Sequence, residues 1–357
     1  MQTEIAHIDP MQPEPALIEH AARLLRQGKL VVFPTETVYG LGADALQPGA
    51  IKQIFVAKGR PFSDPLIVHI ADEEVLETLV VHVPPQARVL ARTFWPGPLT
   101  LILPAGPRVP RLVTAGLPNV ALRMPRHPVA LALIRALGSP IAAPSANRFM
   151  HISPTTAHHV LADLAGRVPF ILDGGPCEIG VESTVLDLCA AVPTILRPGG
   201  VSLEALRTVL PEVQPSQSLP RSGENASQAE EAGGMSSPGQ MSVHYAPTVP
   251  TLLFEGTLET MRAAMLAEIA RRSAQGEQVG VLIADEDMPT FQESGARIYT
   301  VGSTPEQVAT RLYAGLRTLE EAGVQAILCR DFAEAGLGRA IRDRLRKAAG
   351  GKVIKQR

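Results

Sequence analysis

The sequence predicts two α/β domains of unequal size, joined by a polar segment of low complexity. Apolar runs of strand length alternate with helical patterns along most of the chain. The composition breaks at 211–240, where Pro, Ser, Gly, Gln and Glu dominate and no aromatic residue occurs. With 357 residues, 45% of them hydrophobic, the chain can build two ordinary cores. We therefore expect domains at 1–210 and 249–357, with a linker at 211–248.

The first domain is predicted to open with a helix, because Leu17, Ala21 and Leu24 recur at helical spacing and Gly28 follows as a cap. Strand-like runs and helical patterns then alternate irregularly, with prolines at most strand ends. This irregularity favours a sheet of mixed direction over a regular parallel array. Strands are expected at 30–33, 66–70, 99–103, 120–123, 140–143, 170–172, 184–188 and 194–196, and helices around 49–57, 84–94, 128–137 and 155–165.

The second domain is predicted to be a small parallel α/β unit, because its strands and helices alternate cleanly. One expected helix places Leu258, Met261, Met265 and Ile269 on a single face. Another begins with Thr304-Pro305-x-Gln307, a capping box with proline at the first helical position. Strands are expected at 250–254, 279–284, 297–301 and 325–329, and a basic terminal helix at 338–348.

Composition and motifs exclude several classes of protein. The net charge of -2 argues against a surface devoted to nucleic acid. The three cysteines form no C-x-x-C pair, which favours a reducing cytoplasm. We expect no membrane span, since no run of about eighteen apolar residues occurs. There is no P-loop and no complete dinucleotide fingerprint, so any nucleotide site would be of an unfamiliar kind. H-E-x-x-H is absent and the adjacent His158 and His159 cannot act as an i, i+4 pair, so we expect no protein-bound metal.

Side chains suited to a charged ligand gather in five segments at expected strand ends or turns. Two of these segments, PTETVYG at 34–40 and GVEST at 180–184, each combine hydroxyls with one glutamate. Two such clusters in one domain predict one polar cavity lined from several strand ends. The pairs Gly174-Gly175 and Gly199-Gly200 would let the backbone approach a ligand closely.

The other three segments each allow two interpretations. Lys58 and Arg60 flank a glycine and could clamp a polyphosphate, or they could simply end a solvated helix. Ser145 and Asn147 alternate on an extended chain and could donate to phosphate or ribose, or they could form an ordinary turn. Arg123 ends a strand and could hold a carboxylate in a bidentate manner, or it could pair with a structural Asp.

Taken together, these segments resemble the YrdC/Sua5 family of threonylcarbamoyl-AMP synthases, and the whole chain resembles its two-domain Sua5 form. The matching stretches are PTETVYGLG, KGRP with DPLIVHI, WPGPLT, VALRMP, APSAN, DGG with GVEST, ILRPG and, beyond the linker, HYAP and GLGRAIRDRLRKAA. The resemblance implies a YrdC-like twisted open mixed sheet with a positively lined cavity, plus a smaller Rossmann-like α/β C-terminal domain.

The resemblance also implies an activity. L-threonine, bicarbonate or CO2, and ATP would give threonylcarbamoyl-AMP and pyrophosphate, with Mg2+ accompanying ATP. The product would serve t6A modification at position 37 of tRNA, completed by a separate Kae1/TsaD-type transferase.

By the same resemblance, site roles fall on individual residues. Catalysis and the ATP phosphates match Lys58, Arg60, Ser145 and Asn147. The threonine positions match Thr37, His69, Arg123, Ala143 and Ser183, with Arg123 on the carboxylate. The nucleotide positions match Asn119, Ser153, Arg197 and Tyr245, the last in a segment expected to fold over the site. Asp64, counted with the ATP residues, replaces the Asn of many relatives, which weakens a direct phosphate contact and leaves a magnesium-mediated one open.

Two alternatives remain open beside the synthase. The first is an RNA-binding module without catalysis, whose basic face would use Arg108, Arg111, Arg123, Arg126 and Arg135. The second is an enzyme that makes a carbamoyl-adenylate from carbamoyl phosphate; the chain lacks the additional regions such enzymes carry. Direct tRNA binding, the general base, the role of the second domain and the oligomeric state stay open.

Overall fold

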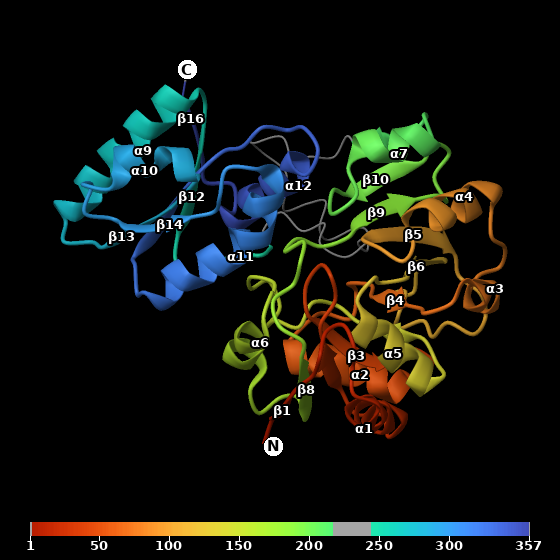
Figure 1. Cartoon of the computed structure of the whole chain (residues 1–357). Helices are drawn as coiled ribbons and strands as arrows, with labels where there is room; N and C mark the ends of the chain where they lie inside the picture. The colour runs from red at the N-terminus through yellow and green to blue at the C-terminus, as the bar shows by residue number, and fades with distance from the viewer. Residues whose placement is uncertain (1, 217–243, 357) are drawn as a thin grey trace. The chain divides into compact units, whose positions relative to one another are not determined.

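The computed structural model describes residues 2–216 and 244–356, and the chain divides into two compact units (Figure 1). Unit 1 comprises Met1–Phe149, Ser153–Glu178 and Glu182–Gln240, and unit 2 comprises Met150–Ile152, Ile179–Val181 and Met241–Arg357. Both units are α/β, as predicted. None of the helices in these described ranges combines the length and apolar character needed to cross a bilayer.

The sheet of unit 1 is mixed, as predicted. Its strand order in the described residues is β1-β8-β2-β3-β7-β4-β6-β5-β9-β10-β11. Pairs such as β2·β8 and β4·β6 are parallel, whereas β2·β3 and β5·β6 are antiparallel. The strands are β1 (Glu4–His7), β2 (Val31–Phe33), β3 (Gly40–Asp44), β4 (Ile67–His69), β5 (Leu99–Pro104), β6 (Asn119–Arg123), β7 (Ile141–Ala142), β8 (Phe170–Asp173), β9 (Thr184–Asp187), β10 (Thr194–Arg197) and β11 (Gln214–Pro215).

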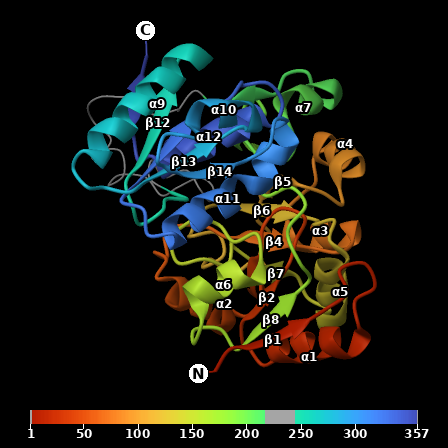
Figure 2. The ribbon, with the colours of Figure 1, turned by 60° about the vertical axis from the view of Figure 1, so that its left-hand side comes forward.

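Helices cover both faces of this sheet. The helices α1 (Pro15–Arg26) and α5 (Pro128–Leu137) lie side by side in both views and share a core cluster with Val31 and Phe33 (Figures 1 and 2). Val32, whose side chain points to the other face, belongs to a second cluster. That cluster takes in residues of α2 (Pro48–Lys58), α3 (Leu76–Leu79, preceded by the 3-10 turn Glu73–Val75), α4 (Pro85–Phe94), α6 (Ala157–Leu164) and α7 (Leu203–Val209).

Three predictions for unit 1 were wrong or incomplete. The domain does not open with a helix, because β1 precedes α1 and pairs with β8. The strand β3 was missed, since its Gly-Leu-Gly-Ala-Asp sequence reads as a turn and becomes a strand only through pairing with β2 and β7. The strand β11 lies in the expected linker, where it pairs with β10. Gly28 does follow α1, with a φ of 73°.

Unit 2 is the small parallel sheet that its alternation predicts, ordered β14-β13-β15-β12-β16. The capping box at Thr304 and Gln307 is confirmed. Of the four residues predicted on one face of the first helix, Met261, Met265 and Ile269 are buried, whereas Leu258, the first residue of that helix, is 45% exposed. The strands are β12 (Thr251–Glu255), β13 (Val279–Ile283), β14 (Arg297–Thr300), β15 (Ala326–Arg330) and the unexpected β16 (Val353–Lys355); the helices are α9 (Leu258–Ser273), α10 (Met288–Phe291, preceded by the 3-10 turn Asp285–Asp287), α11 (Pro305–Glu321) and α12 (Gly338–Ala348).

Unit 2 also takes in two short segments from earlier in the chain. The Arg317 guanidinium of α11 donates to the carbonyl of Ile152, and His151 Nε2 lies 3.0 Å from Glu320 Oε2. Gly180 has a φ of +80°, and a Cβ there would lie 2.5 Å from the carbonyl oxygen of Ala309. Glycine is therefore required where this segment packs against α11.

Candidate functional site

Lys58 joins two of the predicted motifs. It is the last residue of α2, and Gly59, with a φ of 67°, turns the chain toward Arg60. Lys58 Nζ donates to the backbone oxygens of Ser145 and Asn147, each at 2.6 Å. Burial, and then the charge of Arg60, lower the pKa of the Lys58 ammonium. The structure thus brings together the two pairs assigned to ATP.

Arg60 is held in place by Asp64. Arg60 Nη2 lies 2.8 Å from Asp64 Oδ1 and donates to the carbonyl of Pro65 at 2.7 Å. The carboxylate is fully buried, and burial raises the pKa of Asp64 against the opposing charge of Arg60. Within the described residues, neither Asp64 oxygen has a partner that meets hydrogen-bond geometry, so the contact with Arg60 is an ion pair with unused acceptor capacity.

Arg123 lies at the centre of the residues assigned to threonine. Its Nε donates to the carbonyl of Gly97 at 3.2 Å, and its Nη1 donates to Thr37 Oγ1 at 2.9 Å. Its Nη2 lies 2.7 Å from Glu36 Oε1. The ends of β2 and β6 therefore meet, and the partner of Arg123 is a glutamate rather than an aspartate.

His69 and Ala143 belong to strands beside Arg123. His69 is opposite Arg123 in the β4·β6 register, and the backbone nitrogen of Ala143 donates to the carbonyl of Ile67 at 3.0 Å. Burial and the charge of Arg123 lower the pKa of His69 to about 3. His69 is therefore a neutral imidazole at physiological pH.

Ser183 and Arg197, assigned to different substrates, are in direct contact. Arg197 Nη2 donates to the Ser183 carbonyl at 2.9 Å and to its hydroxyl at 3.1 Å. The Ser183 hydroxyl also lies 2.8 Å from Thr100 Oγ1. Ser153 donates to Glu182 Oε1 at 2.5 Å. Sequence analysis missed Thr100 and assigned no role to Glu182, since only tertiary contact links them to the site.

The close approach expected at Gly199 is to the chain itself. A Cβ on Gly199 would lie 2.3 Å from the carbonyl oxygen of Glu182, and Gly200 donates to that oxygen at 3.0 Å. The glycine pair therefore packs β10 against the start of β9, and the interpretation as a ligand-facing backbone is corrected. At the other pair, a Cβ on Gly174 would lie 2.9 Å from the Pro34 ring.

The contacts of Asn119 and Tyr245 do not test their assignment to the nucleotide. Asn119 begins β6 and Arg123 ends it, roughly 13 Å away along an extended strand. Tyr245 belongs to unit 2, where its ring lies 5.8 Å from that of Tyr313 and 4.8 Å from the Arg344 guanidinium. The predictions that Asn119 and Tyr245 bind the nucleotide stay predictions.

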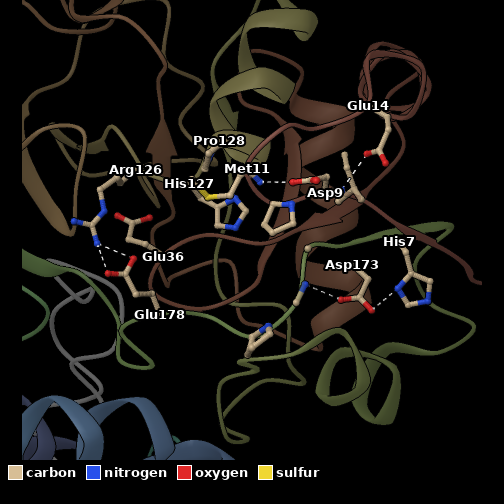
Figure 3. Close-up of a pocket in the computed structure, with 15 residues that line it drawn as sticks. His7, Asp9, Met11, Glu14, Glu36, Arg126, His127, Pro128, Asp173 and Glu178 are labelled. Carbon is tan, nitrogen blue, oxygen red and sulfur yellow. Dashed lines mark hydrogen bonds and ion pairs between the residues drawn. The ribbon is translucent and has the colours of Figure 1, made fainter.

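A pocket of about 690 Å³ opens in unit 1 beyond the carboxyl ends of the parallel strands β1, β8 and β2 (Figure 3). Its lining includes Glu36, which sequence analysis noted among the hydroxyls of its segment but left without a role. The signal was a carboxylate three residues after the end of a wholly apolar strand. Figure 3 shows Glu36 beside His127 and the exposed ion pair between Arg126 and Glu178, whose atoms lie 2.9 Å apart.

Comparison with known families gives two matches. Residues 23–199 match the Sua5_yciO_yrdC family model, described as "Telomere recombination". Residues 201–350 match a model described as "Threonylcarbamoyl-AMP synthase, C-terminal domain". The two matches meet within unit 1, between β10 and α7.

Individual relatives span nearly the whole chain. A threonylcarbamoyl-AMP synthase of Pyrococcus abyssi is 44% identical over 95% of each chain, and one of Bacillus subtilis is 45% identical over 97% of each. The crystal structure of P. abyssi Sua5 complexed with L-threonine has a TM-score of 0.91 at 43% identity, covering 99% of this chain and 100% of that one. A P. abyssi Sua5 with a histidine and a tyrosine changed to alanine has a TM-score of 0.89 at 42% identity, covering 99% of this chain and 98% of that one.

Proposed function

This chain belongs to the Sua5/YrdC family of threonylcarbamoyl-AMP synthases, and we propose how its residues share the work of that reaction. The enzyme joins L-threonine, bicarbonate or CO2, and ATP into threonylcarbamoyl-AMP and pyrophosphate for t6A modification of tRNA. One observation carries the assignment of residues. Lys58 donates to the backbone oxygens of both Ser145 and Asn147. The motif that holds the two cations and the motif that holds the serine and asparagine therefore meet, although they are far apart in the sequence.

The ATP phosphates are assigned to Lys58, Arg60, Ser145 and Asn147. Lys58 and Arg60 are 4% and 7% exposed, so their charges act where water screens them little. Cations held in place before the reaction stabilise the charge that develops as pyrophosphate leaves, at no cost of reorganisation. Asp64 supports this role by fixing the orientation of Arg60.

L-threonine, which the solved relative contains, is assigned to the cluster around Arg123 because the family resemblance matches these residues to the threonine positions. Arg123 supplies the positive charge for the carboxylate. Thr37, neutral His69, Ala143 and Ser183 complete the subsite, and all four are buried. Arg197, which holds both the carbonyl and the hydroxyl of Ser183, connects this subsite to the nucleotide side, to which Asn119 and Ser153 are also assigned.

The simplest mechanism for these residues is direct attack. The threonine ammonium first loses a proton to solvent; the amine then adds to CO2 and releases a second proton to solvent as the carbamate forms. A carbamate oxygen then forms a bond to the α-phosphorus of ATP. The bond between the α-phosphorus and the oxygen that bridges to the β-phosphorus breaks, and its electron pair leaves with pyrophosphate. The burial of Lys58, Arg60 and Arg123 favours this route, because a carbamate must react before it loses CO2.

Magnesium enters this proposal together with ATP. The described residues hold no group of three or more His, Cys, Asp or Glu side chains that could bind a metal by themselves. The buried Asp64 carboxylate, with its unused acceptor capacity beside Arg60, fits a hard cation that is held mainly by phosphate oxygens. When bound, Mg2+ would neutralise part of the charge on the phosphates.

The remaining assignments extend the same proposal. Tyr245 would cover the nucleotide, tRNA would receive the product through a Kae1/TsaD-type transferase, and the enzyme would act in the cytoplasm. The cytoplasmic assignment is supported by three free cysteines, of which Cys177 and Cys329 are buried thiols. Direct RNA binding gains little support, because Arg123 is buried and paired with Glu36, Arg126 with Glu178, and Arg135 with Asp72.

Pyrophosphate release from ATP by the purified full chain tests this function. We expect release that requires both L-threonine and bicarbonate, and that stops when Mg2+ is chelated. Release that ignores threonine would point to another adenylate chemistry. No release, combined with retained tRNA binding, would favour an RNA-binding module.

A further inference from the structure

Glu36 is a buried carboxylate whose acceptor capacity is not used. It is 2% exposed and directly follows the apolar strand β2 and the turn at Pro34-Thr35. Its Oε1 lies 2.7 Å from Arg123 Nη2, but the geometry of this contact is that of an ion pair without a hydrogen bond. Among the residues that the structure describes, no donor reaches either Glu36 oxygen in hydrogen-bond geometry. A buried carboxylate in this state is costly unless a ligand completes it.

The pocket around Glu36 lets a small molecule reach it and favours one that carries positive charge. Glu36 lines the pocket shown in Figure 3, which is wide enough for a small molecule. Four further acidic side chains line the same pocket, against one arginine and two histidines, so the lining favours a cation. These acidic residues are Asp9, Glu14, Asp173 and Glu178.

The cation that fits is an organic ammonium rather than a metal ion. The described residues contain no group of three or more metal-ligating side chains. The Glu36 oxygens instead face a neighbouring guanidinium, so a carboxylate and a cation lie side by side in a buried site. An α-amino acid presents the complementary pair, an ammonium and a carboxylate two bonds apart on one carbon.

We propose that Glu36 positions the α-ammonium group of the amino-acid substrate, reached from the pocket beyond β1, β8 and β2. This inference rests on the proposed function, in which Arg123 receives the substrate carboxylate. Glu36 accepts hydrogen bonds from the ammonium and thereby fixes the nitrogen that later becomes the carbamate nitrogen. A site built this way rejects hydroxy acids, because their neutral hydroxyl would leave the buried carboxylate uncompensated.

The test uses calorimetry to compare the binding of threonine and of its hydroxy-acid analogue to the full-length protein. In this analogue, 2,3-dihydroxybutanoate, a hydroxyl replaces the α-ammonium. In the unmodified protein, the analogue should bind about 10–100-fold more weakly than threonine, as expected for loss of a charged hydrogen bond. In Glu36→Gln, threonine binding should weaken by a similar factor, and the preference for threonine over the analogue should shrink to a few-fold. ATP binding should stay unchanged.

Glu178→Gln is the matched control, since Glu178 is a carboxylate of the same pocket that is exposed and paired with Arg126. It should keep the full preference for threonine. Equal binding of threonine and its analogue to the unmodified protein would overturn the proposal even if Glu36→Gln fails to fold. Full discrimination by a folded Glu36→Gln would also overturn it, whereas absence of any threonine binding would instead defeat the proposed function.

Discussion

Three buried carboxylates, Asp287 of unit 2 and Glu36 and Asp64 of unit 1, differ in how their oxygens are used. In unit 2, Asp287 is fully buried and accepts hydrogen bonds from Arg262 Nε at 2.8 Å, Arg330 Nη1 at 3.2 Å and the backbone nitrogen of Ala284 at 3.1 Å. In unit 1, Glu36 and Asp64 are equally buried, yet none of their oxygens accepts a hydrogen bond from a described residue.

Whether the oxygens of a buried carboxylate accept hydrogen bonds distinguishes structural from functional carboxylates better than burial alone does. A carboxylate whose acceptors are all used contributes to folding, and nothing more is needed to explain it. A carboxylate with unused acceptors lowers stability, and it is retained where a ligand completes it. By this criterion the candidate site lies in unit 1, and the ion pairs of unit 2 serve its own fold.

The strongest test of this comparison removes the satisfied carboxylate. Asp287→Ala should destabilise unit 2 by about 3–5 kcal/mol, because Arg262 and Arg330 lose their shared buried partner. Thermal unfolding of unit 2 should shift to lower temperature, while pyrophosphate release per folded molecule stays within about twofold. A folded variant that loses activity would contradict the separation of roles.

The converse change removes a charge at the site. Lys58→Met keeps the length and apolar stem of the side chain but removes its ammonium. Pyrophosphate release should fall about 100–1000-fold, the cost typical of losing one donor that stabilises transition-state charge. The melting temperature is measured in parallel, because Lys58→Met also leaves the carbonyls of Ser145 and Asn147 without this donor. Near-normal turnover would remove Lys58 from the phosphate site.

A pH titration gives a second test on a carboxylate whose oxygens are used in hydrogen bonds, Glu320 of unit 2. Burial raises the pKa of Glu320, but bonds from His151 and Thr248 outweigh it and lower the pKa to about 2. Since the folded pKa is below the unfolded one of 4.5, the stabilisation is present above pH 4.5 and is lost as the pH falls through about 2. Glu320→Gln should therefore melt a few degrees below the unmodified protein at pH 7. This difference in melting temperature should become smaller as the pH is lowered. A difference that does not depend on pH would contradict a stabilising role for the Glu320 carboxylate.

The smallest effect is expected at the rim of the pocket. Arg126→Ala removes an ion pair with Glu178 in which both side chains are more than half exposed. Such pairs contribute at most about 1 kcal/mol, so the melting temperature should hardly change. Threonine binding should also stay within about threefold. A large loss of threonine affinity would mean that the pocket rim, and not Glu36 alone, recognises the substrate.

Sequence patterns predict the site more fully than they predict its chemistry. Lys58, Arg60, Ser145 and Asn147 stand in short motifs, and the family resemblance of those motifs groups them, whereas their spacing alone leaves a structural alternative open for each pair. The unused acceptors of Glu36 depend on Arg123, which lies 87 positions away, and no local pattern encodes that geometry.

The same limit applies to the fold. Alternation predicts unit 2 almost strand for strand, because parallel strands linked by helices give a regular pattern. The strand β3 escapes prediction, since its two glycines gain strand conformation only from neighbours on both sides. Short strands held by tertiary pairing carry no periodic signal.

The make-up of unit 2 has a consequence for split proteins. If the chain were expressed as two pieces divided between residues 217 and 243, His151, Ile152 and Gly180 would travel with the first piece. Their partners in unit 2, Glu320, Arg317 and Ala309, would travel with the second. The second piece would then lack these contacts and be less stable by itself, and adding the first piece should restore its stability.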